Sequence, residues 1–210
     1  MKTRILSASE PDAIQQVLEV LQQGGLVAIP TDTVYGLGAL VFDVAAVERI
    51  YTAKGRPGEK AIPVLIGDPL ELEKIVLEIP ENAAILAEHF WPGPLTLVFP
   101  KLPGLPAAVA SGATIGVRIP DHRLARALLQ QTGPMAVSSA NLSGMPNPMT
   151  AGEVMEQLDE RIDLILDGGR TPGGMPSTVV DCTGQDPQIL REGPISKAEI
   201  MRILGRDLSS

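Results

Sequence analysis

The stretch Ile14–Gly38, IQQVLEVLQQGGLVAIPTDTVYGLG, predicts a helix, a buried strand and a polar loop in direct succession. Its first part repeats apolar residues at helical spacing and ends at Gly24–Gly25, where a helix commonly stops. Leu26–Ile29 is a short apolar run between glycine and proline, which is typical of a strand buried on both faces. A helix followed by such a strand places the chain in the α/β class.

Polar residues follow that strand directly. Pro30–Gly38 contains Thr31, Asp32 and Thr33. Ligands of α/β sheets bind at the carboxyl ends of strands, so this loop is a candidate binding site. An ordinary turn stabilised by threonine and aspartate side chains would have the same composition.

The rest of the chain alternates helical and strand-like patterns at first, and then brings strand-like runs closer together. We expect strands at 62–66, 95–99, 114–119, 135–138, 162–166, 178–181 and 188–191, with helices starting near 43 and 68, at 81–89, 121–129 and 150–158, and from 196. This order favours a mixed parallel and antiparallel sheet with packed helices over a regular doubly wound parallel sheet.

The totals bound the class of protein. The chain has 210 residues, of which 44% are hydrophobic, so a sizeable core can form and we expect one domain over 1–210. Its single cysteine, Cys182, excludes an internal disulfide. No stretch approaches the roughly 20 apolar residues of a membrane span, and no signal peptide is present. We therefore expect a cytoplasmic protein without a membrane partner.

The charge distribution points to a small anion. The net charge of −8 argues against bulk nucleic-acid binding. The basic residues that stand out are nevertheless placed in loops and at strands: Lys54, Arg56, Lys60, Arg118 and Arg191. An acidic protein with such a distribution can gather its cations around one anionic ligand.

The standard nucleotide and catalytic signatures are absent from the sequence. There is no G-x-x-x-x-G-K-[ST] loop, and Gly36–Gly38 lacks the rest of a dinucleotide fingerprint. There is no G-x-S-x-G elbow, and two histidines with one cysteine cannot form a zinc site unaided. If the protein uses a nucleotide, it binds it without a P-loop.

Three further segments are candidates for anion binding. Lys54–Lys60 has three cations in seven residues and suits a triphosphate, although a solvated loop is as good an interpretation. Arg118 lies opposite the apolar face of its strand and needs a partner, which a carboxylate ligand or a structural acid would supply equally well. Ser138–Gly144 offers hydroxyls, an amide and small residues near backbone N–H groups, or a simple capping turn. We interpret His89, His122 and Cys182 as structural.

These segments occur in an order that resembles one known family. Pro30–Gly38, Lys54–Pro57, Gly116–Pro120, Ser138–Gly144, Ser177–Asp181 and Leu190–Pro194 together resemble the YrdC-type threonylcarbamoyl-adenylate synthases, over about residues 10–200. The pairing of K-x-R-P with S-x-N-x-S-G is the most specific part of the resemblance. It implies an open, twisted mixed sheet with a positively charged concave groove.

The resemblance also implies a reaction. Threonine, bicarbonate (or CO2) and ATP would give threonylcarbamoyl-AMP and pyrophosphate, which makes the protein a nucleotidyltransferase with ATP as substrate and Mg²⁺ as the expected ion. The product would pass to the machinery that forms N6-threonylcarbamoyladenosine at position 37 of tRNA, and direct contact with tRNA or double-stranded RNA is a further expectation.

Site residues are implied by position. The threonine site would comprise Thr33, Arg118, Val137 and Ser177. The ATP site would comprise Lys54, Arg56, Lys60, Thr114, Ser139, Asn141, Asn147 and Arg191. No catalytic residue and no metal ligand is assigned, because attack of a carbamate oxygen on the α-phosphate needs no protein nucleophile.

The chain departs from the family pattern in two places. Some members have a histidine in the strand after the Lys/Arg loop, where this sequence has Leu65, so one threonine contact is absent or replaced. The extra C-terminal domain of longer members is also expected to be absent.

Two other functions compete with this interpretation. A related enzyme could use another carbamoyl adduct, as the carbamoyl-phosphate domain of hydrogenase maturation proteins does. An RNA-binding module could use the same basic groove, although 3% aromatic residues leave few stacking platforms. Salt distinguishes the RNA-binding module from the enzyme. RNA binding should weaken steeply with ionic strength, whereas threonine-dependent pyrophosphate release should not.

Overall fold

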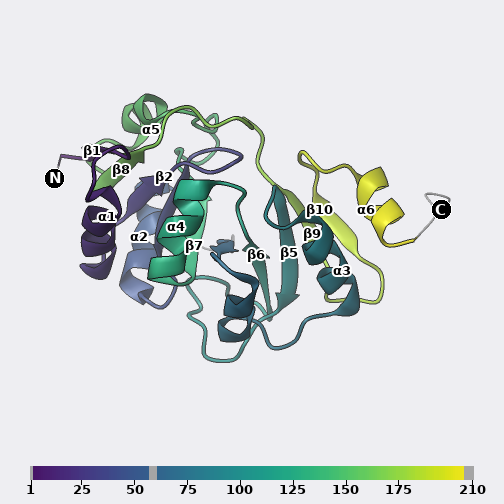
Figure 1. Cartoon of the computed structure of the whole chain (residues 1–210). Coiled ribbons are helices and arrows are strands. Elements are labelled where there is room, and N and C mark those ends of the chain that lie inside the picture. Colours follow the sequence, from purple (N-terminus) through teal and green to yellow (C-terminus); the bar gives the residue numbers. More distant parts are fainter. Residues whose placement is uncertain (1, 57–60, 206–210) are drawn as a thin grey trace.

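The computed structural model describes residues 2–56 and 61–205, and these form one sheet with helices packed on it (Figure 1). The strands are β1 (Arg4–Ser7), β2 (Val27–Ile29), β3 (Gly36–Leu40), β4 (Val64–Leu65), β5 (Leu95–Pro100), β6 (Thr114–Arg118), β7 (Met135–Ser139), β8 (Leu164–Asp167), β9 (Thr178–Asp181) and β10 (Gln188–Arg191). The helices are α1 (Ala13–Gln22), α2 (Val44–Lys54), the 3₁₀ helix η1 (Pro69–Lys74), α3 (Glu81–Phe90), α4 (Arg123–Thr132), α5 (Ala151–Leu158) and α6 (Lys197–Ile203).

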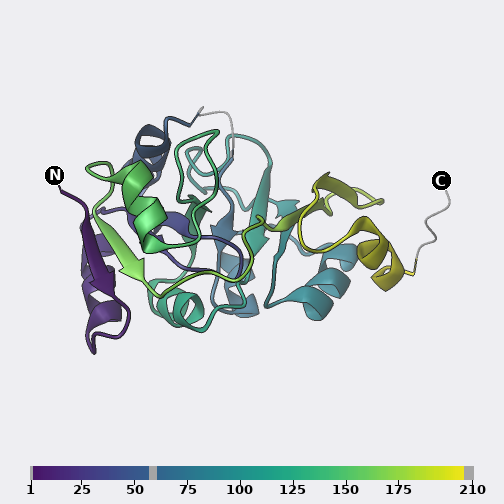
Figure 2. The ribbon, with the colours of Figure 1, turned by 90° about the horizontal axis from the view of Figure 1, so that it is seen from above.

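The sheet is mixed, which confirms the predicted class. Its strand order is β1-β8-β2-β3-β7-β4-β6-β5-β9-β10. The sheet combines parallel pairs (β1 with β8, β2 with β8, β4 with β6 and β5 with β9) with antiparallel ones such as β3 with β7 and β5 with β6. Figure 2 shows the amino-terminal strand and the α6 end of the chain at opposite ends of the molecule.

Two strands were not predicted. β1 was missed because its four residues, Arg-Ile-Leu-Ser, show no period-two alternation of apolar and polar side chains. β3 lies inside the segment interpreted as a loop, because Gly36 and Gly38 interrupt its apolar pattern. A Cβ atom at Gly36 would lie 2.6 Å from Cγ1 of Val137 on the neighbouring β7. Glycine is therefore needed there for close approach of two strands.

Helix starts follow local capping. Asp43 caps α2 by accepting from the Ala46 N–H at 3.0 Å, as expected for a helix starting near residue 43. Asp121 was expected to cap the next helix, but this helix, α4, starts at Arg123 and is capped by the residue before it. His122 is its cap, and Nδ1 of His122 accepts from the Ala125 N–H at 3.4 Å. This gives His122 a structural role.

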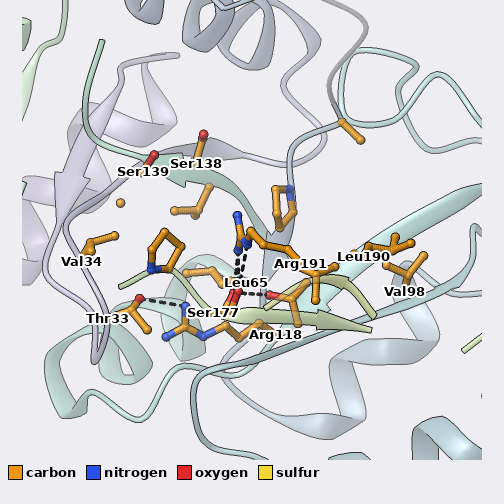
Figure 3. Close-up of a pocket in the computed structure, with 18 of the residues that line it drawn as sticks. Thr33, Val34, Leu65, Val98, Arg118, Ser138, Ser139, Ser177, Leu190 and Arg191 are labelled. Carbon is orange, nitrogen blue, oxygen red and sulfur yellow. Dashed lines mark hydrogen bonds between the residues drawn. The ribbon is translucent and has the colours of Figure 1, made fainter. Parts of the chain in front are cut away.

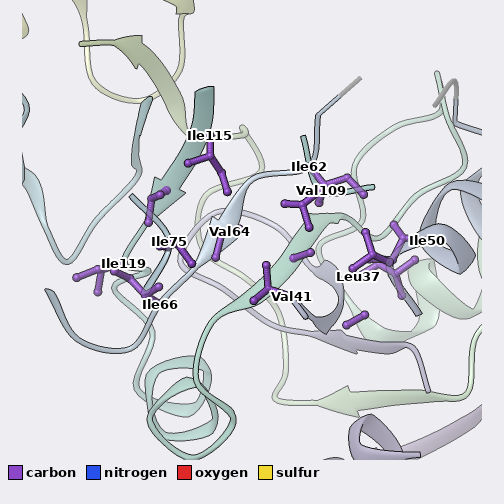
Figure 4. Packing of buried hydrophobic residues seen from close by; sticks show 14 of the residues in the cluster. Leu37, Val41, Ile50, Ile62, Val64, Ile66, Ile75, Val109, Ile115 and Ile119 are labelled. Carbon is purple, nitrogen blue, oxygen red and sulfur yellow. The ribbon is translucent and has the colours of Figure 1, made fainter. Parts of the chain in front are cut away.

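The core divides between the two faces of the sheet. The larger cluster packs α2, α3, α5 and α6 against one face and includes Leu37, Val64 and Ile115 (Figure 4). The smaller cluster packs α1 and α4 against the other face, over β2, β7 and β8. Strand alternation then turns Thr96, Val98 and Arg118 away from the larger cluster. On that second face, beyond α1 and α4, a cavity opens.

Candidate active site

A cavity of about 420 Å³ lies over the ends and middles of seven strands. Alternate residues of β6, β5 and β9 form its base, and the loop 31–34 and Pro176 close its sides. Among the lining residues in the described part of the chain there are three arginines (Arg56, Arg118 and Arg191) and one carboxylate, that of Asp181. An anion is the ligand that such a lining favours.

Arg118 projects from β6 and is almost completely buried (Figure 3). Its Nε donates to the Gly93 carbonyl at 3.0 Å, its Nη1 to Oγ1 of Thr33 at 3.0 Å, and its Nη2 to Oδ1 of Asp32. Burial lowers the pKa of Arg118, while the Asp32 carboxylate opposes this shift. Asp32 is thus a structural partner for the Arg118 charge. Arg118 also lines the cavity, so it can contact a ligand there as well.

Thr33 is held in place by its own loop. Oγ1 of Thr31 donates to the Val34 carbonyl at 2.7 Å and lies 3.0 Å from Oγ1 of Thr33. The Thr33 N–H in turn donates to Oγ1 of Thr31 at 3.2 Å. The polar loop predicted after β2 is therefore a stabilised turn whose Thr33 hydroxyl lies beside Arg118 in the cavity.

Ser177 and Arg191 form the opposite wall. Nε and Nη2 of Arg191 donate to the Ser177 carbonyl at 3.0 and 2.7 Å, and Nη2 lies 3.2 Å from Oγ of Ser177. That hydroxyl is 2.7 Å from Oγ1 of Thr96. Burial, and then the positive charges of Arg118 and Arg56, lower the pKa of Arg191. Arg191 is therefore close enough to both other arginines to be repelled by them, and a bound anion would relieve that repulsion.

Lys54 and Asn141, which the resemblance assigns to the ATP site, contact each other beside the cavity, and their part in ATP binding stays a prediction. Neither side chain is among those that line the cavity, and Lys54 is only 2% exposed. Its ammonium donates to the carbonyl of Ser139, to the carbonyl of Asn141 at 2.6 Å and to Oδ1 of Asn141 at 3.2 Å. Burial, with a smaller effect of Arg56, lowers the pKa of Lys54 to about 8. Lys54 therefore supports the loop that carries Ser139 from behind.

The other predicted site residues divide as follows. Thr33, Arg56, Thr114, Arg118, Val137, Ser139, Asn147, Ser177 and Arg191 all line the cavity. Lys60 lies outside the described residues. Leu65, where some relatives have histidine, also lines the cavity. Which ligand each side chain contacts stays a prediction.

Several lining residues were missed by sequence reasoning. Thr96 and Val98 on β5, and Val179 and Asp181 on β9, all face the cavity. The signal was available, because each strand alternates apolar core positions with these residues at a period of two. The alternation was used as evidence only for Arg118, because a charged side chain in a strand needs a partner, whereas a valine or a threonine does not.

The described residues contain neither a metal centre nor a membrane-spanning helix. Across 2–56 and 61–205, no three His, Cys, Asp or Glu side chains are placed to hold a metal ion. None of the helices in those residues has the length and hydropathy needed to cross a bilayer.

The sequence matches the Sua5/YciO/YrdC family model, which carries the description "Telomere recombination", over residues 19–193. This chain belongs to the Sua5/YciO/YrdC family. The resemblance inferred from its motifs is thereby confirmed.

Individual relatives agree. The threonylcarbamoyl-AMP synthase of Pyrococcus abyssi is 45% identical over 187 residues, which cover 88% of this chain and 55% of the relative. A putative threonylcarbamoyl-AMP synthase of Mycobacterium tuberculosis is 39% identical over 213 residues, covering 99% and 98% of the two chains. The structure of P. abyssi Sua5 complexed with L-threonine has a TM-score of 0.92 at 41% identity, covering 98% of this chain and 62% of that one. This chain thus spans little more than half the length of the P. abyssi enzyme.

Proposed function

We propose that this chain is an L-threonylcarbamoyl-AMP synthase that forms its product from L-threonine, bicarbonate or CO2, and ATP. The observation that carries the proposal is the buried Arg118 between two hydroxyl-bearing residues of the cavity, Thr33 and Ser177. The similarity to enzymes named as such synthases, and to a Sua5 structure containing L-threonine, supports it.

Arg118 suits the carboxylate of threonine. A guanidinium has five N–H groups, and the bonds described above use three of them, for Gly93, Thr33 and Asp32. One N–H on each terminal nitrogen remains, which is the fork that a carboxylate accepts. The hydroxyls of Thr33 and Ser177 then lie within the same cavity, where they can bind the amine or hydroxyl of the amino acid.

The remaining cations suit the phosphates. In the proposed reaction the threonine amine takes up CO2 as a carbamate, a carbamate oxygen forms a bond to the α-phosphorus, and the bond from that phosphorus to the pyrophosphate oxygen breaks. Arg56 and Arg191 lie on the cavity wall, where they can offset charge on the carbamate and the phosphates. Holding the two reactants in line supplies much of the remaining rate enhancement.

Mg²⁺ fits this site as an ion carried by the triphosphate. Such an ion keeps several waters and is held largely by substrate phosphates, so the site needs no cluster of acidic side chains. No described residue is assigned as its ligand. The ion would neutralise phosphate charge. We extend the proposal to a cytoplasmic role in supplying the tRNA-modifying machinery, as the resemblance implies.

Pyrophosphate release tests the proposal. Release from ATP is measured with threonine and bicarbonate each left out in turn, and we expect it to need both. Arg118→Gln should lower kcat/KM for threonine by about 100-fold or more, because a buried charged hydrogen bond to the carboxylate is lost. Arg170→Gln is the matched control, since Arg170 is an exposed arginine that contacts Glu153 at 3.7 Å and Sδ of Met149 at 3.5 Å, outside the cavity.

The other outcomes discriminate between functions. Release without threonine would indicate another carbamoyl acceptor or a plain ATPase. No release by the folded protein with Mg²⁺ present would contradict the enzyme proposal and favour RNA binding by the same cavity.

A further inference from the structure

The cavity-facing residues of β6, β5, β9 and β10 form two rows across the sheet. One row runs Thr96, Val179 and Arg191, which are paired in register on β5, β9 and β10. The next row runs Gly116, Val98 and Asp181, paired on β6, β5 and β9. Successive rows are two residues apart along each strand, which is about 7 Å.

The two rows differ in chemical character. Arg191 supplies the cation of the first row. In the second row Gly116 has no side chain, so the sheet is flat there, and Val98 is apolar. Leu190, which lines the same part of the cavity, is 58% exposed and adds a second apolar surface. Asp181 stands at the edge of this surface and is the only carboxylate among the lining residues that the structure describes.

The Asp181 carboxylate is fixed and retains acceptor capacity. Its Oδ1 accepts from the N–H of Thr183 at 2.9 Å and from Oγ1 of Thr183 at 2.7 Å. These two bonds orient the group. A carboxylate offers about four lone-pair sites, so the second oxygen can accept from hydroxyl groups of a ligand.

We propose that Asp181 binds the ribose hydroxyls of the nucleotide and so makes the site selective for a ribonucleotide. This inference rests on the proposed function, and within it we assign the α-phosphate to Arg191. In a nucleotide the ribose directly follows the α-phosphate, and the spacing of one row, about 7 Å, suits a hydroxyl of that sugar.

Charge decides the direction of the nucleotide. Pyrophosphate would be repelled by an unpaired carboxylate, so it points away from Asp181 and toward Arg56. The neutral ribose and base then lie over Gly116 and Val98, with Thr114, two residues further along β6, at the far end. A carboxylate paired with a vicinal diol satisfies both partners, because hydroxyls are donors and an ionised carboxylate only accepts.

Substrate analogues test the assignment. The kcat/KM for pyrophosphate release is measured with ATP, 2′-deoxy-ATP and 3′-deoxy-ATP for the wild type, Asp181→Ala and Asp181→Asn. We expect the wild type to prefer ATP over at least one deoxy analogue by about 10- to 100-fold, the range for one hydrogen bond to a charged group. Asp181→Ala should lose most of this preference by slowing ATP and not the analogue.

The controls separate a sugar contact from a structural effect. Thr183→Val removes the hydroxyl that orients Asp181 without touching the cavity, and it should keep the preference for ATP. Asp181→Asn keeps an oxygen for the Thr183 N–H and covers the case in which Asp181→Ala fails to fold. An equal loss with ATP and with both analogues would overturn the inference, as would a wild type that does not discriminate.

The failure of this inference is distinguishable from failure of the proposed function. Calorimetric titration of the wild type and Asp181→Asn with ATP and the two analogues measures the same preference without turnover. If no nucleotide releases pyrophosphate but Asp181→Asn still removes a preference in binding, the ribose assignment stands and the synthase proposal falls. A change in the ratio of ATP to GTP alone would assign Asp181 to the base and overturn the ribose contact.

Discussion

Lys54 and Asn141 are polar residues whose position in sequence suggests phosphate binding, and in the structure they contact each other. The Lys54 ammonium has three donors and three oxygen acceptors on the segment that contains Ser139 and Asn141. The Lys54 carbonyl also accepts from the Ser143 N–H at 2.8 Å. The ammonium and the backbone carbonyl of Lys54 thus both hold the segment 139–143 against the end of α2. The two most specific motifs of the chain are one structural unit.

Lys54→Met is expected to destabilise the protein by about 1–3 kcal/mol, since it leaves buried carbonyl oxygens without a donor. It should also raise KM for ATP, because Ser139 lines the cavity on the loop that Lys54 supports. Denaturant unfolding and steady-state kinetics measure both effects. Lys74→Met is the control: Lys74 is exposed and paired with Glu71 at 3.4 Å, and its loss should change stability by less than about 0.5 kcal/mol. Equal stabilities of the two variants would contradict a supporting role for Lys54.

At the scale of elements, the β9–β10 pair sets the distance between Ser177 and Arg191. Gly193, just after β10, packs against the backbone that leads into β9. A Cβ atom there would lie 2.4 Å from the Thr178 nitrogen and 2.6 Å from the Pro176 oxygen. Because both neighbours are backbone atoms, neither can rotate away. Glycine at this position lets the segment that carries Arg191 lie close against the segment that carries Ser177.

Gly193→Ala should therefore cost about 1–3 kcal/mol of stability and lower activity, because the segments that carry Ser177 and Arg191 must separate. Gly184, in the turn of the same hairpin, gives a matched substitution. A Cβ atom at Gly184 would meet only the Asp186 oxygen, at 3.8 Å, which is ordinary contact. Thermal unfolding and pyrophosphate release of both variants are the measurements. If Gly184→Ala is as damaging as Gly193→Ala, the close contact is not the cause.

For the whole molecule, the main electrostatic feature is a cluster of cations in an acidic protein. The net charge is −8, yet Arg56, Arg118 and Arg191 line one cavity. Bound anions should stabilise the folded state, by about 2.7 kcal/mol at a concentration 100-fold above Kd.

We expect pyrophosphate to raise the melting temperature, and expect the rise to shrink as sodium chloride increases from 50 to 500 mM (roughly a threefold shorter screening length). Arg56→Gln should reduce the shift, whereas Arg170→Gln should not, because Arg170 is outside the cavity. Thermal scanning with and without pyrophosphate measures this. A shift that is the same in all three proteins would show that the anion binds elsewhere.

The sequence was sufficient for most of this architecture. Period-two alternation located β6 and turned Arg118 to the correct face, and Asp43 marked the start of α2. Sequence reasoning did not detect β3, because its glycines resemble those of a loop. They are needed for close contact with β7, which the local sequence does not reveal. It also could not tell that Lys54 is buried, because a cation beside glycine and proline has the same local pattern whether water or three oxygens surround it. In both cases the structure depends on residues far away in the sequence, on β7 for β3 and on Ser139 and Asn141 for Lys54.

The pairing of β1 with β8 has a consequence for how the chain folds during synthesis. Arg4 lies opposite Leu164 in this pair, and β2, the next strand along the chain, also adds to β8. At 5–20 residues per second, a ribosome needs on the order of 8–30 s to deliver the partner of β1 after β1 itself has emerged. During that interval the edges of β1 and β2 that pair with β8 have no partner, and unpaired strand edges are templates for aggregation. A nascent chain that stalls before residue 164 would lack the central strand between β1 and β2, so molecular chaperones that cover exposed strands are expected to act on this end of the protein first.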